Sequence, residues 1–403
     1  MSNHHRHAPK PPPAFHIITK PRGALCNLAC QYCYFRLKEH LYPDSTLRMT
    51  DDVLKHYTRQ YIQSQRTSEV MFIWQGGEPL LMGLEFYEKA LAFQHQFARP
   101  GQAIHNALQT NGTLLNHEWA AFFHRHHFLL GLSLDGPAVW HDAYRVDKGG
   151  QPTHAQALRG LQVLKHYPVD FNILCCVHQA NMHFPLEVYR YLRDELAARF
   201  IQFIPIVQRD HPGGFQRGAA LRPESVNPQQ YGQFLSTVFD EWVRRDVGRV
   251  FVQIFDVAFN AWLGLRPGLC TFEPTCGLAP ALEHNGDLYA CDHYVEPDYR
   301  LGNIAERPLP VLMGMNQQVR FGQDKQKTLP HYCRVCPVRF VCNGGCPKDR
   351  LALTPEGEPG LNYLCAGYRD FFTHIDKPMK MMAELLRSHR PPSDVMQQLT
   401  LPR

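Results

Sequence analysis

Short apolar runs alternate with longer amphipathic stretches along the first half of the chain. The runs are rich in β-branched and aromatic residues, which is typical of strands, and they cover residues 15–19, 70–74, 107–110, 129–134, 171–177 and 199–207. Between them, apolar residues recur at helical spacing over residues 49–65, 84–97, 118–126, 154–166 and 185–198. Six strand–helix units in a row predict an α/β fold with a parallel sheet that right-handed crossovers can curl into a partial barrel.

The alternation stops after residue 207. Residues 209–228 are rich in proline, glycine and charge and predict a long loop, followed by amphipathic helices over 228–247 and 250–263. A chain of 403 residues is long enough for two or three domains. We therefore predict five segments, namely a disordered tail (1–14), the barrel (15–207), a linker with helices (208–265), a cysteine-rich domain (266–376) and a C-terminal tail (377–403).

Composition narrows the class of protein. The 42 basic and 37 acidic residues leave a net charge of +5, which is too modest to indicate nucleic-acid binding. No apolar run is long enough to span a bilayer, and the polar, His-rich and Pro-rich residues 1–13 lack the apolar core of a signal peptide. In a large chain without such a signal, 13 cysteines favour metal ligation or redox chemistry over disulfides. These features predict a cytoplasmic protein.

The first three cysteines form a compact motif directly after the first predicted strand. Cys26, Cys30 and Cys33 follow the spacing CxxxCxxC. Three thiolates can hold three irons of a four-iron, four-sulfur cluster and leave the fourth iron open. A zinc site would need a fourth ligand nearby, and the nearest candidate, His40, lies at an unusual spacing. The spacing favours the cluster, and a zinc loop remains the alternative.

Polar and glycine-rich motifs come just after the strands, where barrels of this kind carry their chemistry. The second strand ends in Gln75-Gly76-Gly77-Glu78-Pro79, in which the paired glycines allow close approach of backbone to a ligand. The Glu78 carboxylate is suited to receive an ammonium group. A plain Gly-Gly turn is the alternative interpretation.

The next two strands end in further polar groups. Asn111 lies in the sequence QTNGT and can line a polar pocket, although an Asn-Gly turn explains it equally well. Ser133 ends the fourth strand in SLDGP, and Arg145 follows within the same connection. An arginine there can clamp a carboxylate with two hydrogen bonds, the alternative being a surface ion pair with Asp142.

The last third of the chain contains eight more cysteines. They are Cys270, Cys276, Cys291, Cys333, Cys336, Cys342, Cys346 and Cys365. Eight thiols form two sets of four, the number that fully ligates two iron–sulfur clusters or two zinc ions. A predicted hairpin over residues 281–289, with Asn285-Gly286 at its turn, delivers Cys291 to its set.

The cysteine loop, with the aromatic Tyr32 before its third cysteine, resembles that of the radical S-adenosylmethionine (radical SAM) enzymes. The resemblance implies a partial (β/α)6 barrel and a cluster whose open iron binds the amino and carboxylate groups of S-adenosyl-L-methionine (SAM). It also implies that the reduced cluster cleaves SAM to a 5′-deoxyadenosyl radical. The residues that would contact SAM by this resemblance are Tyr32, Gln75, Gly76, Gly77, Glu78, Asn111, Ser133 and Arg145. Among them, Glu78 and the glycines would hold the amino group, Ser133 and Arg145 the ribose and carboxylate, and Gln75 the substrate side.

The cysteine-rich region resembles the SPASM extension of radical SAM enzymes that modify peptides and proteins. It shares a Cys-x5-Cys pair, a third cysteine after a hairpin, then CxxCx5CxxxC and a distant last cysteine. By this resemblance two auxiliary 4Fe-4S clusters join the first one. One would be held by Cys270, Cys276, Cys291 and Cys346, and the other by Cys333, Cys336, Cys342 and Cys365.

Over residues 15–376 the chain resembles the anaerobic sulfatase-maturating enzymes. The shared motifs are CNLxCxYCY, WQGGEPL, QTNG, SLDGPxxxHDxxR, QFIP, CDHYV, LGN and CxxCPxxxxCNGGCPKxR. The resemblance implies hydrogen abstraction from Cβ of a cysteine or serine in an unfolded sulfatase segment such as Cys/Ser-x-Pro-x-Arg, giving Cα-formylglycine. Asp292 would be the base, an auxiliary cluster would take the second electron, and a flavodoxin or ferredoxin would supply electrons.

One position departs from the family pattern, and two other functions stay open. Relatives carry a tyrosine two places after the third cysteine, whereas this chain has Tyr34-Phe35, with the hydroxyl one place earlier. The nearer alternative function is a radical SAM–SPASM maturase that forms thioethers or crosslinks in another peptide. The more distant one is a zinc-binding interaction module without catalysis, which leaves the strand-end motifs unexplained.

Overall fold

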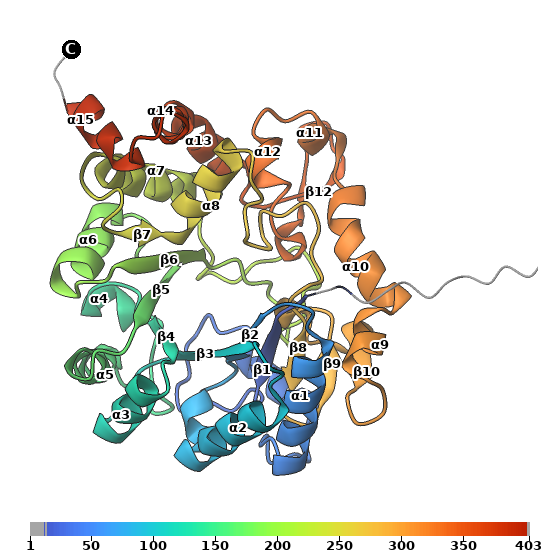
Figure 1. Ribbon diagram of the computed structural model, residues 1–403. Helices are drawn as coiled ribbons and strands as arrows, with labels where there is room; N and C mark the ends of the chain where they lie inside the picture. Colours follow the sequence, from blue (N-terminus) through green and yellow to red (C-terminus); the bar gives the residue numbers. More distant parts are fainter. Residues whose placement is uncertain (1–11, 13, 401–403) are drawn as a thin grey trace, which may run out of the picture.

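The computed structural model describes residue 12 and residues 14–400 (Figure 1). The predicted N-terminal tail therefore lies almost entirely outside the described residues. Within the described part of the chain, no helix is both long and apolar enough to cross a membrane.

The six predicted strands form a parallel sheet in chain order. They are β1 (Ile17–Lys20), β2 (Glu69–Trp74), β3 (Ala103–Thr110), β4 (Leu129–Ser133), β5 (Phe171–Val177) and β6 (Phe200–Pro205). A seventh short strand, β7 (Phe251–Val252), pairs in parallel with β6 and was not predicted as a strand. The carboxyl ends of β1 to β6 therefore share one edge, where the strand-end motifs gather.

The helices between these strands cover the outer side of the sheet (Figure 1). They are α1 (Asp51–Ser64), α2 (Leu84–Phe97), α3 (His117–Arg125), α4 (Ala138–His141), α5 (His154–His166) and α6 (Pro185–Arg190), which continues as the π-helical η3 (Tyr191–Glu195). Their apolar faces pack on the sheet, as Tyr57 and Tyr61 of α1 do against Phe72 of β2. Burial of these faces supplies most of the helical stability.

The cysteine-rich domain extends the barrel sheet on the side of β1. Strand β8 (Ala281–Glu283) pairs in parallel with β1, and β9 (Asp287–Tyr289) and β10 (Arg300–Asn303) continue the sheet in antiparallel fashion. The turn between β8 and β9 contains Asn285 and Gly286, as predicted for the hairpin. One ten-stranded sheet, ordered β10-β9-β8-β1-β2-β3-β4-β5-β6-β7, thus runs through both parts of the chain.

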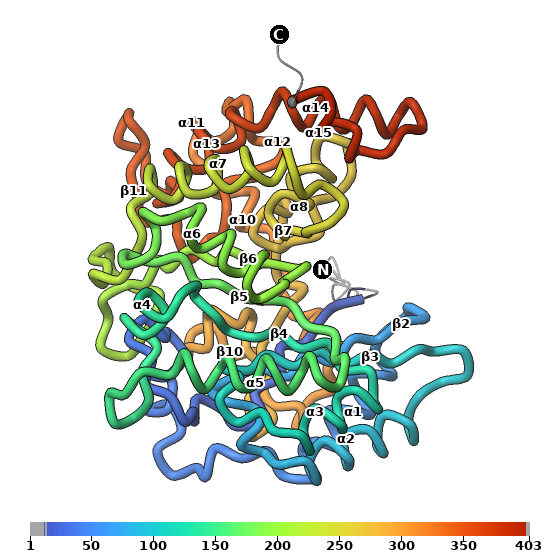
Figure 2. Tube along the Cα trace, turned by 90° about the vertical axis from the view of Figure 1, so that its left-hand side faces the viewer, coloured from blue at the N-terminus to red at the C-terminus, as the bar shows by residue number. Residues whose placement is uncertain are grey.

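Helices complete the second half of the chain. They are α7 (Pro228–Arg245), α8 (Gln253–Trp262), α9 (Leu309–Met313), α10 (Asn316–Lys327), α11 (His331–Arg334), α12 (Arg339–Cys342), α13 (Cys365–His374), α14 (Asp376–Arg387) and α15 (Val395–Thr400). A small hairpin of β11 (Ala352–Leu353) and β12 (Pro359–Leu361) lies between α12 and α13. The predicted C-terminal tail is wrong over the described residues, because α14 and α15 pack on α8 and α7 (Figure 2). Met379 and Met382 of α14 are buried there.

Candidate active site

The loop after β1 gathers Cys26, Cys30 and Cys33 into one place. The amide of Leu28 donates to Sγ of Cys26 over 3.3 Å, and the amide of Cys33 donates to the carbonyl of Cys30. Burial, and to a smaller extent the charges of Glu78 and Cys33, raise the pKa of Cys26 to about 12. A thiol with so high a pKa gives up its proton when a metal takes the proton's place.

The glycine pair after β2 is packed directly against this loop. The amide of Gly77 donates to the Gly23 carbonyl over 2.8 Å, and the amide of Glu78 donates to the Leu25 carbonyl over 2.9 Å. A Cβ on Gly77 would lie 2.0 Å from the Leu25 carbonyl oxygen, so only glycine permits this approach. The Gly-Gly-Glu segment is therefore part of the wall that positions Cys26.

The carboxylate of Glu78 is already held by protein donors. It accepts hydrogen bonds from the amide of Leu80 (3.0 Å), the hydroxyl of Thr110 (2.9 Å) and the amide of Asn111 (2.9 Å), and it is 0 % exposed. Burial raises its pKa to about 7 against these hydrogen bonds, which lower it. The sequence predicts a carboxylate able to receive an ammonium group, and the structure shows that three protein donors already bind this carboxylate. Glu78 ties the end of β3 to the Gly-Gly-Glu turn and places its charge near Cys26.

The side chain of Asn111 faces the cysteine loop. Its Nδ2 donates to Oδ1 of Asn27 over 2.9 Å and lies 3.7 Å from Sγ of Cys26. Its Oδ1 accepts from Thr113. Asn111 therefore orients the loop around Cys26, in addition to lining the edge of the sheet.

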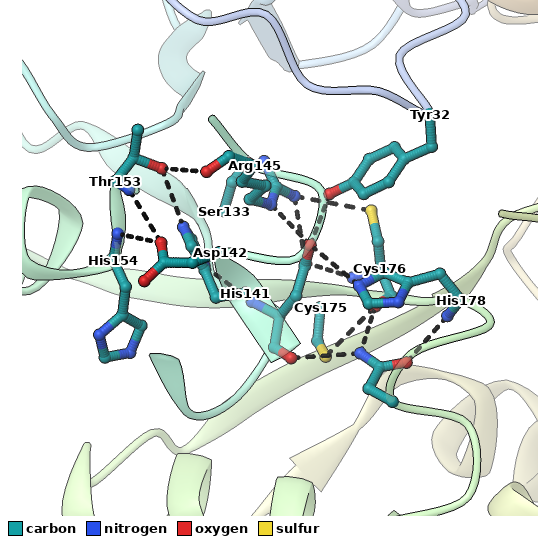
Figure 3. A network of polar contacts seen from close by, with 12 residues as sticks. Tyr32, Ser133, His141, Asp142, Arg145, Thr153, His154, Cys175, Cys176 and His178 are labelled. Carbon is teal, nitrogen blue, oxygen red and sulfur yellow. Dashed lines mark hydrogen bonds and ion pairs between the residues drawn. The ribbon is translucent and has the colours of Figure 1, made fainter. Parts of the chain in front are cut away.

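A buried aspartate organises the predicted Arg145 site. Oδ2 of Asp135 accepts from Nε of Arg145 at 2.7 Å and from the hydroxyl of Tyr32 at 2.5 Å, and Oδ1 accepts from Nη2 of Arg145 at 3.1 Å. The amide of Cys176 and, at 3.7 Å, Nε2 of His178 also face this carboxylate. Figure 3 shows Tyr32, Arg145, Cys176 and His178 converging from three elements. Burial raises the pKa of Asp135, but the charge of Arg145 and the interactions with His178 together lower it further, so the net shift is downward and the carboxylate is ionised.

The alternative interpretation of Arg145 as a surface ion pair with Asp142 is wrong. Arg145 is buried, and the Asp142 carboxylate instead accepts from the amides of Thr153 and His154 over 2.8 Å each, at the start of α5. The predicted Ser133 lies at the end of β4, where its hydroxyl accepts from Nε2 of Gln109.

The carboxylate of Asp292 lies where the barrel meets the cysteine-rich domain. It forms a buried ion pair with the ammonium of Lys20, at the end of β1, and accepts a hydrogen bond from the Tyr34 hydroxyl over 2.6 Å. Burial raises the pKa of Asp292, but the positive charge of Lys20 and the hydrogen bonds lower it further, so that its net shift is downward. Asp292 is thus held as an anion beside the loop that carries Cys33.

Tyr34 and Phe35, where the chain departs from the family pattern, both pack around the Lys20–Asp292 ion pair. Tyr34 supplies the hydroxyl contact to Asp292 from its own position, and the ring of Phe35 lies 4.4 Å below the Lys20 ammonium. Lys20 is 1 % exposed, so this cation contacts an anion on one side and an aromatic face on the other.

The other eight cysteines divide into two groups in space. Burial, followed by the charge of Cys346, raises the pKa of Cys291, and Cys270 acts in the same direction on both Cys291 and Cys346. Cys270 likewise raises the pKa of Cys276. These four thiols therefore lie close to one another, although Cys346 is 55 residues or more from the other three in sequence.

The second group lines one small cavity. Its walls include Cys333, Cys336, Cys342 and Cys365, together with Arg339. Burial raises the pKa of Cys342 to about 12, and the other three thiols add to this effect. Cys342 therefore belongs to the second group and Cys346 to the first, even though only three residues lie between them in sequence.

The donor chemistry of the three groups fits iron–sulfur clusters. Over residues 12 and 14–400, no three His, Cys, Asp or Glu side chains converge closely enough to hold a single metal ion. The ligands of a four-iron cluster bind different irons and surround a larger body than the ligands of one zinc ion do. Groups of three, four and four thiols therefore suit one cluster with an open iron and two fully ligated clusters.

Several residues of the site were not predicted from the sequence. Lys20, Asp135, Cys176 and His178 carry none of the expected roles, yet each contacts a predicted residue. Asp135 lies two residues after the end of β4, His178 directly follows β5, and Lys20 ends β1, so their place at the ends of apolar strands is the signal that could have identified them.

The chain is similar to known proteins over most of its length. A family model described as the Radical SAM superfamily matches residues 21–192, and one described as an iron-sulfur cluster-binding domain (SPASM) matches residues 275–337. A serine-type anaerobic sulfatase-maturating enzyme of Bacteroides thetaiotaomicron is 43% identical over 95% of both chains. A cysteine-type anaerobic sulfatase-maturating enzyme of Clostridium perfringens is 33% identical over 90% of this chain and 96% of the relative. The solved structure "Native anSMEcpe with bound AdoMet and Kp18Cys peptide" superposes with a TM-score of 0.83 at 31% identity, covering 93% of this chain and 99% of that one.

Proposed function

The chain belongs to the anaerobic sulfatase-maturating enzymes, radical SAM enzymes with a SPASM domain, and from this membership we propose that Asp292 is the general base of its reaction. The enzyme converts a cysteine or serine residue of a sulfatase to Cα-formylglycine. The observation that carries the proposal is the position of Asp292. Its carboxylate directly follows Cys291 and reaches Lys20 and Tyr34 beside the first cysteine loop.

Residues of the barrel would bind SAM. Cys26, Cys30 and Cys33 would hold the first of three 4Fe-4S clusters, next to the Gly76–Gly77–Glu78 turn. When bound, this cluster and SAM supply the 5′-deoxyadenosyl radical that removes a hydrogen atom from the substrate Cβ. Asp135 accepts from Nε and Nη2 of Arg145 and fixes its guanidinium in place, so Arg145 would bind the SAM carboxylate through its remaining N–H donors. Tyr32, Gln75, Asn111 and Ser133 complete the proposed binding residues.

Asp292 would then take the proton from the substrate thiol or hydroxyl. The substrate loses two hydrogens in all, one as an atom, and the other as this proton together with an electron that must leave. Lys20 and Tyr34 stabilise the anionic form of Asp292, which is the form that can accept a proton. The cysteine sets around Cys291 and Cys365 would hold two auxiliary clusters that receive the electron, and a flavodoxin or ferredoxin would exchange electrons with the enzyme. Because reduced thiolates persist in a reducing compartment, we place the reaction in the cytoplasm.

The proposed function is tested by mass spectrometry on anaerobically reconstituted enzyme with SAM, a strong reductant and paired peptides. The peptides carry either cysteine or serine at the target position of a Cys/Ser-x-Pro-x-Arg segment. We expect an aldehyde on at least one peptide and 5′-deoxyadenosine alongside. If 5′-deoxyadenosine forms while both peptides stay unchanged, the substrate is another peptide and the maturase with a different product gains support.

Asp135→Asn should weaken SAM binding with little effect on turnover of bound SAM. Hydrogen bonds to charged groups contribute about 1.5–3 kcal/mol, so loss of the ionised partner of Arg145 should raise KM for SAM about ten- to a hundredfold. Initial rates of 5′-deoxyadenosine formation against SAM concentration measure the effect. Asp142→Asn is the matched control, because that carboxylate contacts amides of α5 and not Arg145. An unchanged KM in Asp135→Asn would contradict the proposed role.

A further inference from the structure

Two cations lie beside the SPASM cysteine groups without a carboxylate to balance them. Lys325 of α10 is 1 % exposed, and Arg350 is half-buried beyond α12. Within the described part of the chain, neither takes part in an ion pair with an aspartate or glutamate. The acidic residue next to Arg350, Asp349, is paired with Lys348 at 2.5 Å. Buried charges in proteins are otherwise paired or bound to metal centres, so these two need an anion from another source.

Backbone carbonyls hold both cations against the loops that carry the cysteines. Nζ of Lys325 donates to the carbonyls of Cys270 and Thr271, and the carbonyl of Lys325 in turn accepts from Nη1 of Arg350 over 2.6 Å. Nε of Arg350 donates to the carbonyl of Gly344 over 3.2 Å. Carbonyls satisfy the N–H groups but leave both positive charges without a counter-charge.

Arg350 binds at the point where the chain crosses from one cysteine group to the other. Asn343 and Gly344 lie between Cys342 of one group and Cys346 of the other, and both have positive φ. A Cβ on Gly344 would lie 2.8 Å from Nη2 of Arg350, so glycine permits the close approach of the guanidinium to this crossing.

The thiols of both groups act on Arg350. Burial lowers the pKa of Arg350, and the charges of Cys333 and Cys342 from one group and of Cys346 and Cys276 from the other raise it. Lys325 lies beside the first group, since its Nζ donates to the Cys270 carbonyl; burial lowers its pKa, and Cys346, Cys276 and Cys270 raise it. Four thiolates around a four-iron cluster carry a net negative charge, which is the missing counter-charge for both cations.

We propose that Arg350 is a fixed positive charge shared by the two auxiliary clusters, with Lys325 serving the first, and that it makes both clusters easier to reduce. The proposal rests on the cysteine sets given under the proposed function. A positive charge stabilises the more negative, reduced state of a nearby centre, so it raises the reduction potential. This suits centres that must accept an electron from the oxidised substrate.

Redox titration of the anaerobically reconstituted holoenzyme, followed by electron paramagnetic resonance with iron content measured in parallel, tests the proposal. In Arg350→Gln we expect iron to stay at about twelve per chain. Reduction of both auxiliary clusters should become about tenfold less favourable, which is about 59 mV for one electron. Arg350→Lys should restore potentials close to those of the unmodified enzyme, because it keeps the charge.

Arg339→Gln is the matched control. Arg339 lines the small cavity of the second cysteine group and donates to the Arg334 carbonyl. Among the described contacts, it makes none to the first group. Arg339→Gln should shift the reduction potential of the second auxiliary cluster alone. Full iron with unshifted potentials in Arg350→Gln would overturn the proposal, as would equal shifts in Arg350→Gln and Arg350→Lys.

Two further outcomes separate this proposal from the assignment on which it rests. If the unmodified enzyme binds only about four irons, the auxiliary cysteine sets are wrong, and the role of Arg350 fails with them. If Arg350→Gln alone loses iron, Lys325→Gln is titrated instead. A lowered reduction potential of the auxiliary cluster at Cys270, Cys276, Cys291 and Cys346 then supports the proposal, and an unchanged potential overturns it.

Discussion

Replacement of Asp292 by asparagine should reduce formylglycine formation by about a hundredfold or more while 5′-deoxyadenosine still forms. General bases contribute about 10²- to 10⁴-fold to rates, and asparagine keeps the shape of the side chain without accepting a proton. The SAM residues proposed above lie on other elements, so radical formation should survive. Quantitative mass spectrometry of the peptide, with 5′-deoxyadenosine measured by chromatography, gives the ratio of the two products.

The neighbours of Asp292 provide graded controls for this result. Tyr34→Phe removes one hydrogen bond to the carboxylate and should give a smaller loss than Asp292→Asn. Asp292→Asn also leaves the buried Lys20 ammonium without an anionic partner, and breaking a buried ion pair in this way lowers the stability of the fold. Continued SAM cleavage shows that the barrel is folded in the variant. Full aldehyde yield from Asp292→Asn would show that another group is the base.

Cys26→Ala should abolish both SAM cleavage and peptide oxidation. Its thiol lies within the wall formed by Gly77, Glu78 and Asn111, and only three cysteines serve this cluster in the proposed assignment. Loss of one of three ligands should remove about four irons per chain and reduce 5′-deoxyadenosine to background. Iron analysis and the 5′-deoxyadenosine assay measure the two effects on one sample.

Cys175 offers a matched control for that experiment. It lies fully buried in β5, in the same barrel, and outside all three cysteine groups. Cys175→Ala should therefore retain its iron and most of its activity, at a small cost in packing. Persistent SAM cleavage in Cys26→Ala would refute the assignment of the first cluster, whereas equal losses in both variants would indicate damage to the barrel.

Periodicity and motif spacing predicted the barrel correctly and placed the strand-end motifs at its carboxyl edge. The helices over 84–97 and 154–166 and the strand over 171–177 form at the predicted residues. The spacing of apolar residues identifies the face that each element buries, and that spacing differs between helices and strands. The strand-end motifs meet at one edge, since the carboxyl ends of parallel strands must do so. The separation of the eight later cysteines into two groups followed from the family resemblance and not from spacing.

Only the tertiary structure decided which distant residues meet. Tyr34 and Asp292 are 258 residues apart in the chain, and they meet because β8 adds to the barrel beside β1. The partner of Arg145 is also a tertiary outcome, as Asp135 and Asp142 both follow β4 and only the packing of β5 on β4 selects Asp135. Local spacing fixes which residues share an element, whereas pairing of elements depends on burial across the whole core. That is why the sequence by itself determined the cysteine loop and the strand-end motifs, and the fold decided what holds Asp292 and Arg145 in place.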